Sequence, residues 1–544
     1  MNILGISGNF YRGSADPAAV LLRDGDLVAA AEEERFIRVK HAPSVMPEEA
    51  IRFCLSRGGI GIEDVDVLAF PQTTWDDIER NLNAFCEFQF GGRPKEIRLV
   101  EHHIAHAASA YRTSGFDEAM ILTADWSGDG IAATLGCGEH GRIEIVERLP
   151  APGHSLGIYY ALLTQYLGFR KWDDEYKVMG LASYGEPDTD LSWLLRDGSG
   201  GFSLDEGALH ETLRRPYPSM HGVQQPSFSP EVVERLGPHR VPGSPITPRH
   251  QNLAASGQRR LEEVATDLVR ALHARTGFRN LCVAGGVGLN CSMNQALLAL
   301  ECVDSISVPP VPNDSGIALG AAVEVAAAEG FTIGRLEHAS WGPEFEAEDV
   351  RRILERSKLR YEEHPDVVDF AARAIADDKI VGWFQGRMEF GARALGNRSI
   401  LADPRRSDMR DRINYFVKFR EDFRPLAPSL LEERAGEYLE GSHRSPFMTI
   451  TFGVQPSKRE VVPAVTHVDG TARPQTVTAE ANPRYRRLIE RFDELTGVPV
   501  VLNTSLNVRG APIAMKPEDA LATFYSTGLD HLVIGDFVVS KEPS

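Results

Sequence analysis

Two histidines stand at helical spacing in the segment EHHIAHAASAY, which runs from Glu101 to Tyr111. His102 and His106 are four positions apart among helix-forming residues, so both imidazoles are expected on one helix face. Such a pair can bind a metal ion, or it can be an ordinary polar pair on a helix. The spacing alone does not decide, so the answer depends on which other ligands the chain supplies.

Two aspartates end apolar stretches at turns. Asp125 closes MILTAD before WSGDG, and Asp314 lies in PPVPNDSG. Strand ends of a parallel sheet are where ligand groups gather. Two imidazoles and two carboxylates suit a divalent first-row metal and leave room for substrate oxygens. The alternative, with core or capping histidines and turn aspartates, stands equally open on these residues alone.

A glycine-rich turn follows the apolar run RNLCVA. Glycines let backbone N–H groups approach an anion at a helix N-terminus, so this turn is a candidate phosphate cradle. A sharp structural turn explains it equally well. The residues concerned are Gly285, Gly286, Gly288 and Asn290.

Basic residues gather among glycines, prolines and small polar residues in the last third of the chain. Guanidinium forks bind phosphate oxygens in pairs, so converging arginines indicate a phosphate or phosphoanhydride site. Surface ion pairs are the alternative, but this setting away from regular helix surfaces favours a ligand. The residues are Arg387, Arg393, Arg398, Lys418, Arg424, Arg473, Asn503 and Ser505.

Composition excludes several classes of partner. The chain of 544 residues is long enough for two or more domains, and its net charge of −19 argues against nucleic acid or an anionic membrane as partner. No apolar run reaches the roughly 20 residues of a membrane helix. The N-terminus reads as a first strand, and the six scattered cysteines without a CxxC pair fit a reducing cytoplasm.

The elements that must position these residues follow an α/β pattern with an internal repeat. A strand, a turn at Asp24-Gly25 and another strand open the chain, and a similar unit returns at Ala119. Two such halves are how the actin-like ATPase fold surrounds a nucleotide. We predict helices over 47–57, 105–113, 156–167 and 261–276, and an irregular insertion over 187–250 near the substrate entrance. A second α/β domain follows a boundary near residues 340–346, giving domains of residues 1–343 and 344–544.

In order and number, these segments resemble the O-carbamoyltransferase family of natural-product and nodulation-factor biosynthesis. The resemblance covers nearly the whole chain. It rests on AAAEEERFIRVKH, EHHIAHAASAY, EYKVMGLASYG, VAGGVGLNCSMN, PNDSGIALGAA, GRMEFGARALGNRSILADPR, FRPLAPS, RPQTV and LNTSLN.

The family implies a duplicated actin-like domain resembling threonylcarbamoyl-adenosine transferase, followed by a domain resembling threonylcarbamoyl-adenylate synthase. In relatives, carbamoyl phosphate and ATP form a carbamoyl adenylate in the second domain, and a substrate hydroxyl receives the carbamoyl group at a metal site, iron in close relatives, in the first. By motif, the resemblance implies a divalent metal, iron in close relatives, on His102, His106, Asp125 and Asp314. It implies carbamoyl phosphate on Arg393, Lys418, Arg424, Arg473, Asn503 and Ser505, and we expect Arg387 and Arg398 at the same site. The expected nucleotide residues, for ATP with Mg²⁺, are Gly128, Lys177, Gly285, Gly286, Gly288 and Asn290.

One departure from the family concerns the base for the acceptor hydroxyl. Relatives carry His-Asp after the first strand, whereas this chain has Ala15 and Asp16. We consider His103 or His154 as the replacement, with Asp16, a water or the AMP phosphate as alternatives, and Lys40 as a contact to phosphate or the carbamoyl oxygen.

Two other functions stay open at this point: a small-molecule kinase of the actin-like class, and a non-catalytic regulator that binds carbamoyl adenylate. The partners expected for the transferase are carbamoyl phosphate, ATP and a small-molecule alcohol, a sugar or polyketide hydroxyl, in a cytoplasmic protein that can form a homodimer. The sequence does not identify the acceptor.

Overall fold

The computed structural model describes residues 1–10, 16–198, 201–213, 226–441 and 444–541. The chain forms two compact units. Unit 1 comprises Met1–Val28 and Pro43–Leu336, and unit 2 comprises Ala29–Ala42 and Glu337–Ser544. No helix of the described residues is long and apolar enough to cross a membrane.

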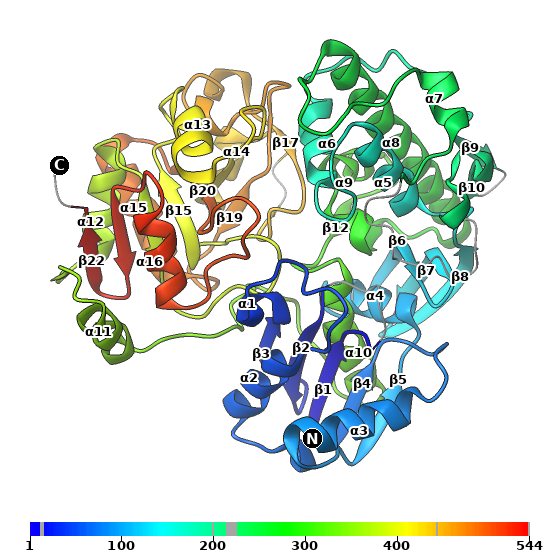
Figure 1. Ribbon diagram of the computed structural model, residues 1–544, viewed down its shortest axis with the longest axis horizontal. Coiled ribbons are helices and arrows are strands. Elements are labelled where there is room, and N and C mark those ends of the chain that lie inside the picture. The colour runs from blue at the N-terminus through cyan, green and yellow to red at the C-terminus, as the bar shows by residue number, and fades with distance from the viewer. Residues whose placement is uncertain (11–15, 199–200, 214–225, 442–443, 542–544) are drawn as a thin grey trace. The chain divides into compact units, whose positions relative to one another are not determined.

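Unit 1 holds a first five-stranded sheet in the order β3-β2-β1-β4-β5, with β3 and β5 as its edge strands (Figure 1). β1 and β2 are antiparallel, and β1, β4 and β5 are parallel. The strands are β1 (Asn2–Ser7), β2 (Ala18–Arg23), β3 (Asp26–Glu32), β4 (Val67–Phe70) and β5 (Glu96–Leu99). The predicted hairpin at Asp24-Gly25 is confirmed as the connection between β2 and β3.

A second five-stranded sheet repeats this arrangement in the order β12-β11-β6-β7-β8. Its strands are β6 (Glu118–Gly128), β7 (Ile131–Glu139), β8 (Arg142–Pro150), β11 (Asn280–Ala284) and β12 (Ser305–Ser307). As in the first sheet, the strands of the hairpin, β6 and β7, are antiparallel, and β6, β11 and β12 are parallel. In chain order both sheets read 3-2-1-4-5, so the expected duplication and the actin-like α/β fold are confirmed.

Helices connect and cover these sheets. They are α2 (Glu48–Gly58), α3 (Ile78–Phe90), α4 (His102–Tyr111), α5 (Leu156–Tyr166), α6 (Glu175–Ala182), α7 (Pro230–Leu236), α8 (Pro248–Thr276), α9 (Cys291–Leu298) and α10 (Asp314–Ala328). α8 begins well before the predicted start at residue 261, because Thr247 caps it and Pro248 occupies its first turn. The remainder of the insertion holds the hairpin strands β9 (Leu195–Gly198) and β10 (Gly201–Leu204).

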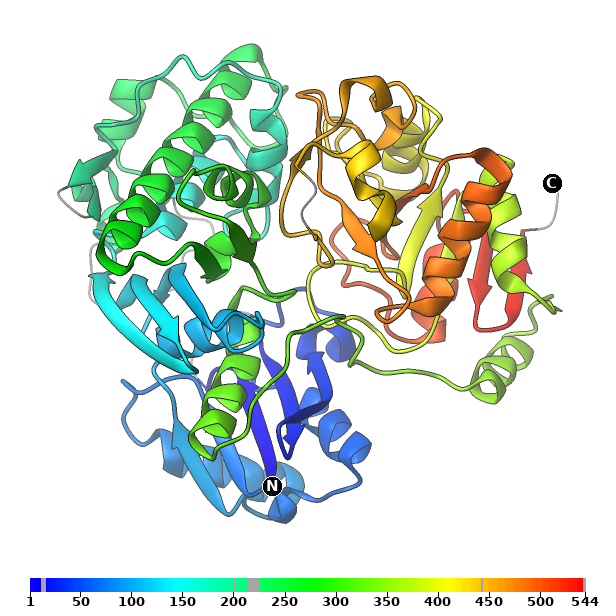
Figure 2. The same cartoon turned by 180° about the vertical axis from the view of Figure 1, so that it is seen from behind.

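α10 is the helix that joins the two halves of unit 1. It packs on β1 and β2 of the first sheet and on α4, and the view from behind shows it crossing the first sheet (Figure 2). The two helices pack closely where Gly320 of α10 meets Ala105 of α4: a Cβ added at Gly320 would lie only 1.8 Å from the carbonyl oxygen of Ala105. The small side chains of GIALGAA therefore let the N-terminus of α10 approach the histidine helix.

Unit 2 is built on a mixed eight-stranded sheet in the order β13-β22-β21-β14-β15-β20-β16-β19. All four residues of β14 are buried, so both faces of the sheet are covered. The strands are β13 (Glu362–Glu363), β14 (Val381–Phe384), β15 (Arg398–Ala402), β16 (Ala427–Leu431), β19 (Gln475–Val477), β20 (Val500–Ser505), β21 (His531–Ile534) and β22 (Phe537–Ser540). The pair β17 (Phe452–Gly453) and β18 (Thr471–Ala472) lies outside this sheet.

Unit 2 also contains a set of helices that connect its strands. They are α1 (Glu33–Ile37), α11 (Ala347–Arg356), α12 (Val367–Ala376), α13 (Met409–Arg412), α14 (Ala435–Tyr438), α15 (Pro483–Thr496) and α16 (Pro517–Tyr525), with a π-helix over Ile413–Lys418. The final segment HLVIGDFVVS forms the antiparallel hairpin of β21 and β22, because Gly535, at φ 58°, turns the chain between them.

The segment Ala29–Ala42 belongs to unit 2 through a set of buried polar contacts. Arg35 is paired with Glu32 and Glu34 and donates to the carbonyl of Gly391 at 2.8 Å, while Glu32 accepts from the backbone N–H of Gly391 at 3.0 Å. Arg38 adds bonds to two backbone carbonyls of the 512–513 segment. The family-typical stretch EERFIRVKH is therefore attached to the loop that carries Arg393.

Candidate functional site

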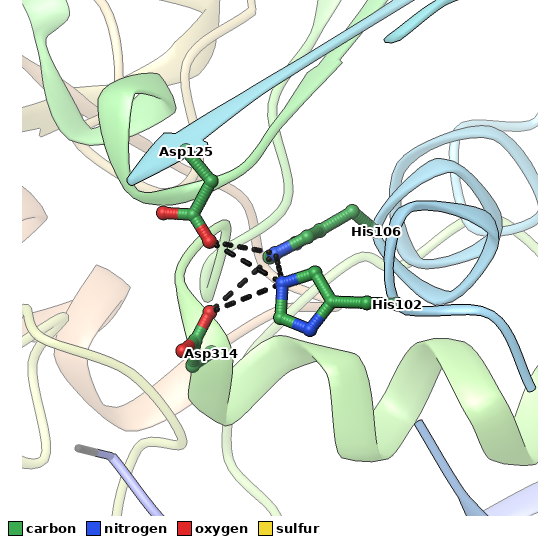
Figure 3. Close-up of side chains that lie close together, drawn as sticks. All are labelled: His102, His106, Asp125 and Asp314. Carbon is green, nitrogen blue, oxygen red and sulfur yellow. Dashed lines mark hydrogen bonds and ion pairs between the residues drawn. The ribbon is translucent and has the colours of Figure 1, made fainter. Parts of the chain in front are cut away.

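His102, His106, Asp125 and Asp314 converge in unit 1 (Figure 3). The Nε2 atoms of the two histidines lie 3.1 Å apart. Asp125 Oδ2 is 3.3 Å from His102 Nε2 and 3.4 Å from His106 Nε2. Asp314 Oδ1 is 3.7 Å and 3.5 Å from the same two nitrogens. The sequence-predicted ligand set is thus brought together by the fold.

These separations fit the coordination shell of a metal ion. Four nitrogen and oxygen ligands at about 2.1 Å from a tetrahedral centre are separated by about 3.4 Å. The five distances above scatter around that value, and most are longer than good hydrogen bonds. Two imidazoles and two carboxylates also form the mixed donor set of divalent first-row metals. The residues present therefore fit such an ion.

The close approach of the two imidazoles and the two carboxylates shifts their pKa values. Burial would raise the pKa of Asp125, but hydrogen bonds with His102 and His106 hold it well below its usual range. Burial and repulsion by Asp125 raise the pKa of Asp314. Its side chain is 31% exposed, whereas Oδ1, the oxygen that faces the histidines, is buried. Burial opposes, but the two carboxylates raise the pKa of His106 to about 9.

Three elements position the ligands. α4 presents both histidines, β6 presents Asp125, and Asp314 is the first residue of α10, where the helix dipole favours a carboxylate. The backbone N–H of Gly286 donates to the other oxygen of Asp125 at 3.1 Å. The glycine turn predicted to cradle phosphate thus spends this N–H on orienting a ligand.

Gly128 lies against the cluster. A Cβ added there would fall 2.1 Å from the imidazole of His102, so a side chain would displace that ring. Its neighbour Asp129, which sequence reasoning missed, accepts from the first N–H of α4 at His102 (3.1 Å) and from Thr73 and Thr74. The sequence signal that could have identified Asp129 is its place before Gly130, since Asp-Gly is typical of a turn.

His103 faces away from the cluster and is fully buried. Its Nδ1 lies 2.7 Å from the hydroxyl of Thr123 and its Nε2 lies 3.0 Å from the carbonyl of Ile131, so both ring nitrogens are engaged. Burial and the neighbouring His102 and His106 lower its pKa to about 3. This geometry does not support His103 as the base for an acceptor hydroxyl.

The other predicted catalytic residues lie in different surroundings. Asp16 accepts at 2.8 Å from the side chain of Asn313, the residue before Asp314. His154 is half-buried, with its ring against Phe202, and Lys40 is half-buried in the segment that belongs to unit 2. Ala15 lies outside the described residues.

Two predicted nucleotide residues are engaged within unit 1. Lys177 is buried in an ion pair with Asp174 at 2.8 Å. Asn290 caps α9 and exchanges side-chain hydrogen bonds with Gln258 at 2.9 Å. Gly285 and Gly288 shape the turn before it, where the backbone N–H of Gly285 donates to Pro312.

The predicted phosphate residues of unit 2 divide into engaged and available cations. Arg398 is fully buried and donates to the backbone carbonyls of Gln385, Gly386 and Pro343. Arg387 donates to the carbonyls of residues 341 and 342. Both arginines stabilise loops, because their guanidinium groups donate to backbone carbonyl oxygens and are not available to a ligand.

Lys418 is likewise engaged. Its ammonium group donates to Ser505 and to both oxygens of Asn507, and burial, with repulsion by Arg420 and Arg424, lowers its pKa well below its usual range. Arg424 lies 3.8 Å from Glu421, and Arg393 is half-buried on the glycine-rich loop.

Arg473 differs from these cations. Within the described part of the chain its half-buried guanidinium has no hydrogen-bond or ion-pair partner, and its Nε is buried. A cation in that state is a candidate for binding an anionic ligand.

Asn503 lies in a buried polar group that the sequence did not reveal. Its Nδ2 donates to Ala394 O at 3.1 Å, Ser429 Oγ at 3.0 Å and Gln475 Oε1 at 3.2 Å. Gln475 carried no sequence signal beyond its place in RPQTV.

The chain thus combines a duplicated actin-like unit that carries a His/Asp cluster with an α/β unit that carries an arginine without a described partner. The chain belongs to the carbamoyltransferase family: the carbamoyltransferase N-terminus matches residues 2–90 and 91–323, and the carbamoyltransferase C-terminus matches residues 372–541. The protein is therefore a transferase of the carbamoyltransferase family, as the sequence resemblance predicted.

Curated relatives extend over most of the chain. Nodulation protein NolNO of Sinorhizobium fredii is 39% identical, with 97% of this chain and 79% of that protein covered. Nodulation protein NolO of Bradyrhizobium diazoefficiens is 40% identical, with coverages of 82% and 79%. Among solved structures, the activator of the 2-hydroxyisocaproyl-CoA dehydratase from Clostridium difficile, with bound ADPNP, is 15% identical with a TM-score of 0.34, covering 62% of this chain and 100% of that one.

Proposed function

We propose that the protein is an ATP-dependent O-carbamoyltransferase that uses carbamoyl phosphate and transfers the carbamoyl group to a hydroxyl of a small-molecule secondary metabolite. Carbamoyl transfer follows from the family. The remaining parts of the proposal, which are the adenylate, the metal and the acceptor hydroxyl, rest on the chemistry of the two sites.

The proposed reaction has two stages. Water cleaves carbamoyl phosphate into carbamate and phosphate, and a carbamate oxygen then attacks the α-phosphorus of ATP, which releases pyrophosphate and leaves carbamoyl adenylate. The acceptor hydroxyl next attacks the carbonyl carbon of the adenylate, AMP leaves, and the hydroxyl proton passes to a base. ATP enters with Mg²⁺, as phosphoryl and nucleotidyl transfer requires neutralised phosphates.

Unit 2 is assigned the first stage. The guanidinium of Arg473 is available for the phosphate of carbamoyl phosphate, and Arg393 and Arg424 are further candidate contacts. Lys418 acts on this site indirectly, because its donors hold the turn at Ser505 and Asn507 in place.

Unit 1 is assigned the second stage. His102, His106, Asp125 and Asp314 would hold the divalent cation, iron(II) by the family resemblance, which supplies Lewis-acid polarisation of the carbamoyl carbonyl and charge neutralisation at the AMP phosphate. The partial exposure of Asp314 leaves that side of the cluster open to the donor and acceptor.

Asp16 is the base that the contacts support best. Its carboxylate is held by Asn313, next to Asp314 in the chain, whereas both nitrogens of His103 are engaged. Asp16→Asn keeps an oxygen for Asn313 and removes the basic carboxylate, so transfer should fall about 10–100-fold with adenylate formation unchanged. A transfer rate within about twofold of the parent would assign the proton to water or to the AMP phosphate.

One observation carries the proposal: the polar groups without partners differ between the two units. Unit 2 has a cation without a described partner, and unit 1 has converging nitrogen and oxygen acceptors. The test measures pyrophosphate release from ATP with and without carbamoyl phosphate, and product formation with candidate sugar and polyketide alcohols. Pyrophosphate release that requires carbamoyl phosphate is expected.

The two other functions give different results in this assay. ADP formation from an acceptor and ATP without carbamoyl phosphate would identify a kinase. Pyrophosphate release that never yields a carbamoylated product with any acceptor would identify an adenylate-binding regulator.

A further inference from the structure

Three polar side chains of unit 2 form one buried group beside the loop that carries Arg393. Ser429 on β16 is directly opposite Gln475 on β19, and Asn503 lies on the neighbouring strand β20. Their exposed fractions are 0%, 5% and 1%. Polar side chains buried this deeply need partners for their donors and acceptors.

Two backbone carbonyls fix the orientation of both amides. A carbonyl oxygen only accepts, so the atom of Gln475 that lies 2.9 Å from Leu395 O must be its nitrogen. By the same reasoning, the atom of Asn503 that lies 3.1 Å from Ala394 O is its nitrogen. Neither amide can be turned over without placing an oxygen against a carbonyl.

The remaining hydrogen bonds agree with this assignment. Gln475 Oε1 accepts from the hydroxyl of Ser429 at 2.7 Å, which uses the single hydroxyl hydrogen. Ser429 Oγ is therefore an acceptor toward Asn503 Nδ2, at 3.0 Å. Gln475 Oε1 also accepts from Asn503 Nδ2 at 3.2 Å. Ser429 and Gln475 thus hold the amide nitrogen of Asn503 on one side.

One strong acceptor is left over. Asn503 Oδ1 is buried and has no hydrogen-bond partner among the described residues. The hydroxyl of Tyr485, also buried, lies near Ser429 and Asn503 but meets hydrogen-bond geometry with neither. A fixed, desolvated carbonyl oxygen of this kind favours a ligand that brings an N–H or O–H donor.

The family resemblance already implies that Asn503 contacts carbamoyl phosphate. We propose that Gln475 and Ser429 are positioning residues that hold Asn503 Oδ1 as the acceptor for the amino group of the carbamoyl unit, so that the site selects carbamoyl over acetyl groups. The inference rests on the proposed function. Arg473 precedes Gln475 by two residues, so the lead-in to β19 carries both the unpaired cation for the phosphate and the residue that orients the amide.

Acetyl phosphate provides the comparison that this chemistry requires. It has nearly the shape and the phosphate of carbamoyl phosphate, but a methyl group replaces the amino group. Bound in the same way, it leaves Asn503 Oδ1 without a donor, and a site built around a substrate N–H discriminates strongly against such an analogue.

The experiment measures inhibition of carbamoyl phosphate-dependent pyrophosphate release by acetyl phosphate. Its readout is the ratio of the acetyl phosphate Ki to the carbamoyl phosphate KM. In Gln475→Met the ratio should fall at least about tenfold, because Ser429 regains a hydrogen that it can donate and only the carbonyl of Ala394 then still holds the Asn503 amide. Ser429→Ala, a smaller change, should lower the ratio by about threefold or more.

Gln385→Met is the matched control. Gln385 is a buried glutamine of the same unit that donates to the carbonyl of Gly535 at 2.9 Å and accepts from Arg484 at 2.8 Å, without contacting Asn503. Its ratio should stay within about twofold of the parent, whatever its loss of stability.

The outcomes separate the inference from the function on which it rests. A parent protein that releases no pyrophosphate with carbamoyl phosphate overturns the proposed function itself. A parent that does so, with folded Gln475→Met and Ser429→Ala proteins that keep the parental ratio, overturns only the inference. An equal fall in Gln385→Met does the same. If Gln475→Met does not fold, the ratio in Ser429→Ala decides.

Discussion

The two units of this chain each bury a polar cluster, and the clusters differ in what they leave unsatisfied. In unit 1, two imidazole nitrogens and two carboxylate oxygens face one another at 3.1–3.7 Å. In unit 2, Arg473 presents donors without a partner among the described residues, and the buried side-chain oxygen of Asn503 likewise has none. Buried groups are normally satisfied, so the unsatisfied atoms indicate the ligand: a cation for the first cluster, and an anion with an amino group for the second.

The comparison also shows how residues of the same type take different roles. Arg398 and Arg387 carry the same guanidinium group as Arg473, but backbone carbonyl oxygens accept their hydrogen bonds, and Lys418 is engaged in a similar way. His102 and His103 are adjacent in the chain, yet only His102 faces a carboxylate. Whether a side chain can bind a ligand therefore depends on whether other protein groups already satisfy its hydrogen bonds, and not on its residue type.

The largest effect is expected from Arg473→Ala. Loss of the unpaired guanidinium should lower carbamoyl phosphate-dependent pyrophosphate release about 100–1000-fold, because the proposed site would lose the half-buried cation that is available to the phosphate of carbamoyl phosphate. A pyrophosphate assay at saturating ATP checks this. Arg406→Ala, which removes an exposed arginine paired with Asp408, is the control and should retain full activity.

Asp314→Ala should affect only the other half of the comparison. Carbamoyl transfer should fall about 100-fold and bound metal should decrease, while pyrophosphate release stays near the parental rate. Metal analysis and both assays on one preparation check this, with the exposed Asp304→Ala as control. Intact transfer in a protein that has lost its metal would remove the metal from the chemistry.

Gly128→Ala should give a smaller effect through geometry alone. The added methyl group would lie 2.1 Å from the ring of His102, so the ring must move and metal affinity should fall about tenfold. Metal titration measures it. Gly130→Ala, two residues on, meets no atom within 4 Å and serves as the control for substitutions in this turn, although its φ of 80° adds some backbone strain. Equal affinities in all three proteins would show that the ring position is not limiting.

The smallest effect concerns pH in metal-stripped protein. The carboxylates raise the pKa of His106 from 6.5 to about 9, so the folded state binds a proton more tightly than the unfolded chain does. That stabilisation is complete below pH 6.5 and is lost as the pH rises through about 9, on the order of 2 kcal/mol. The Tm should therefore fall by a few degrees across this window. His106→Gln should abolish the decline, and a Tm that rises across the window would contradict it.

Local sequence signals predicted much of the fold. The Asp24-Gly25 turn and its repeat marked the duplication, and Pro, Gly and apolar spacing located most helices. The convergence of the His/Asp cluster was predictable because each member carries its own signal: i, i+4 histidines, and aspartates at the ends of apolar runs. These features depend on residues close together in the chain.

Features that depend on distant contacts were not predictable. Nothing in EERFIRVKH indicates that Arg35 binds the carbonyl of Gly391, more than 300 positions away. The engagement of His103 by Thr123 and Ile131, and the group formed by Gln475, Ser429 and Asn503, likewise arise only when strands are aligned. The sequence also gave no indication of which arginines donate to backbone carbonyls and which remain without a partner.

The most direct test of the division between the two units is pyrophosphate release by wild-type protein stripped of transition metal and returned to Mg²⁺ alone. The account predicts that carbamoyl phosphate-dependent pyrophosphate release persists while carbamoylation of the acceptor is lost and returns with Fe(II). Loss of pyrophosphate release together with transfer would contradict it, because the cluster of unit 1 would then be required for the chemistry assigned to unit 2.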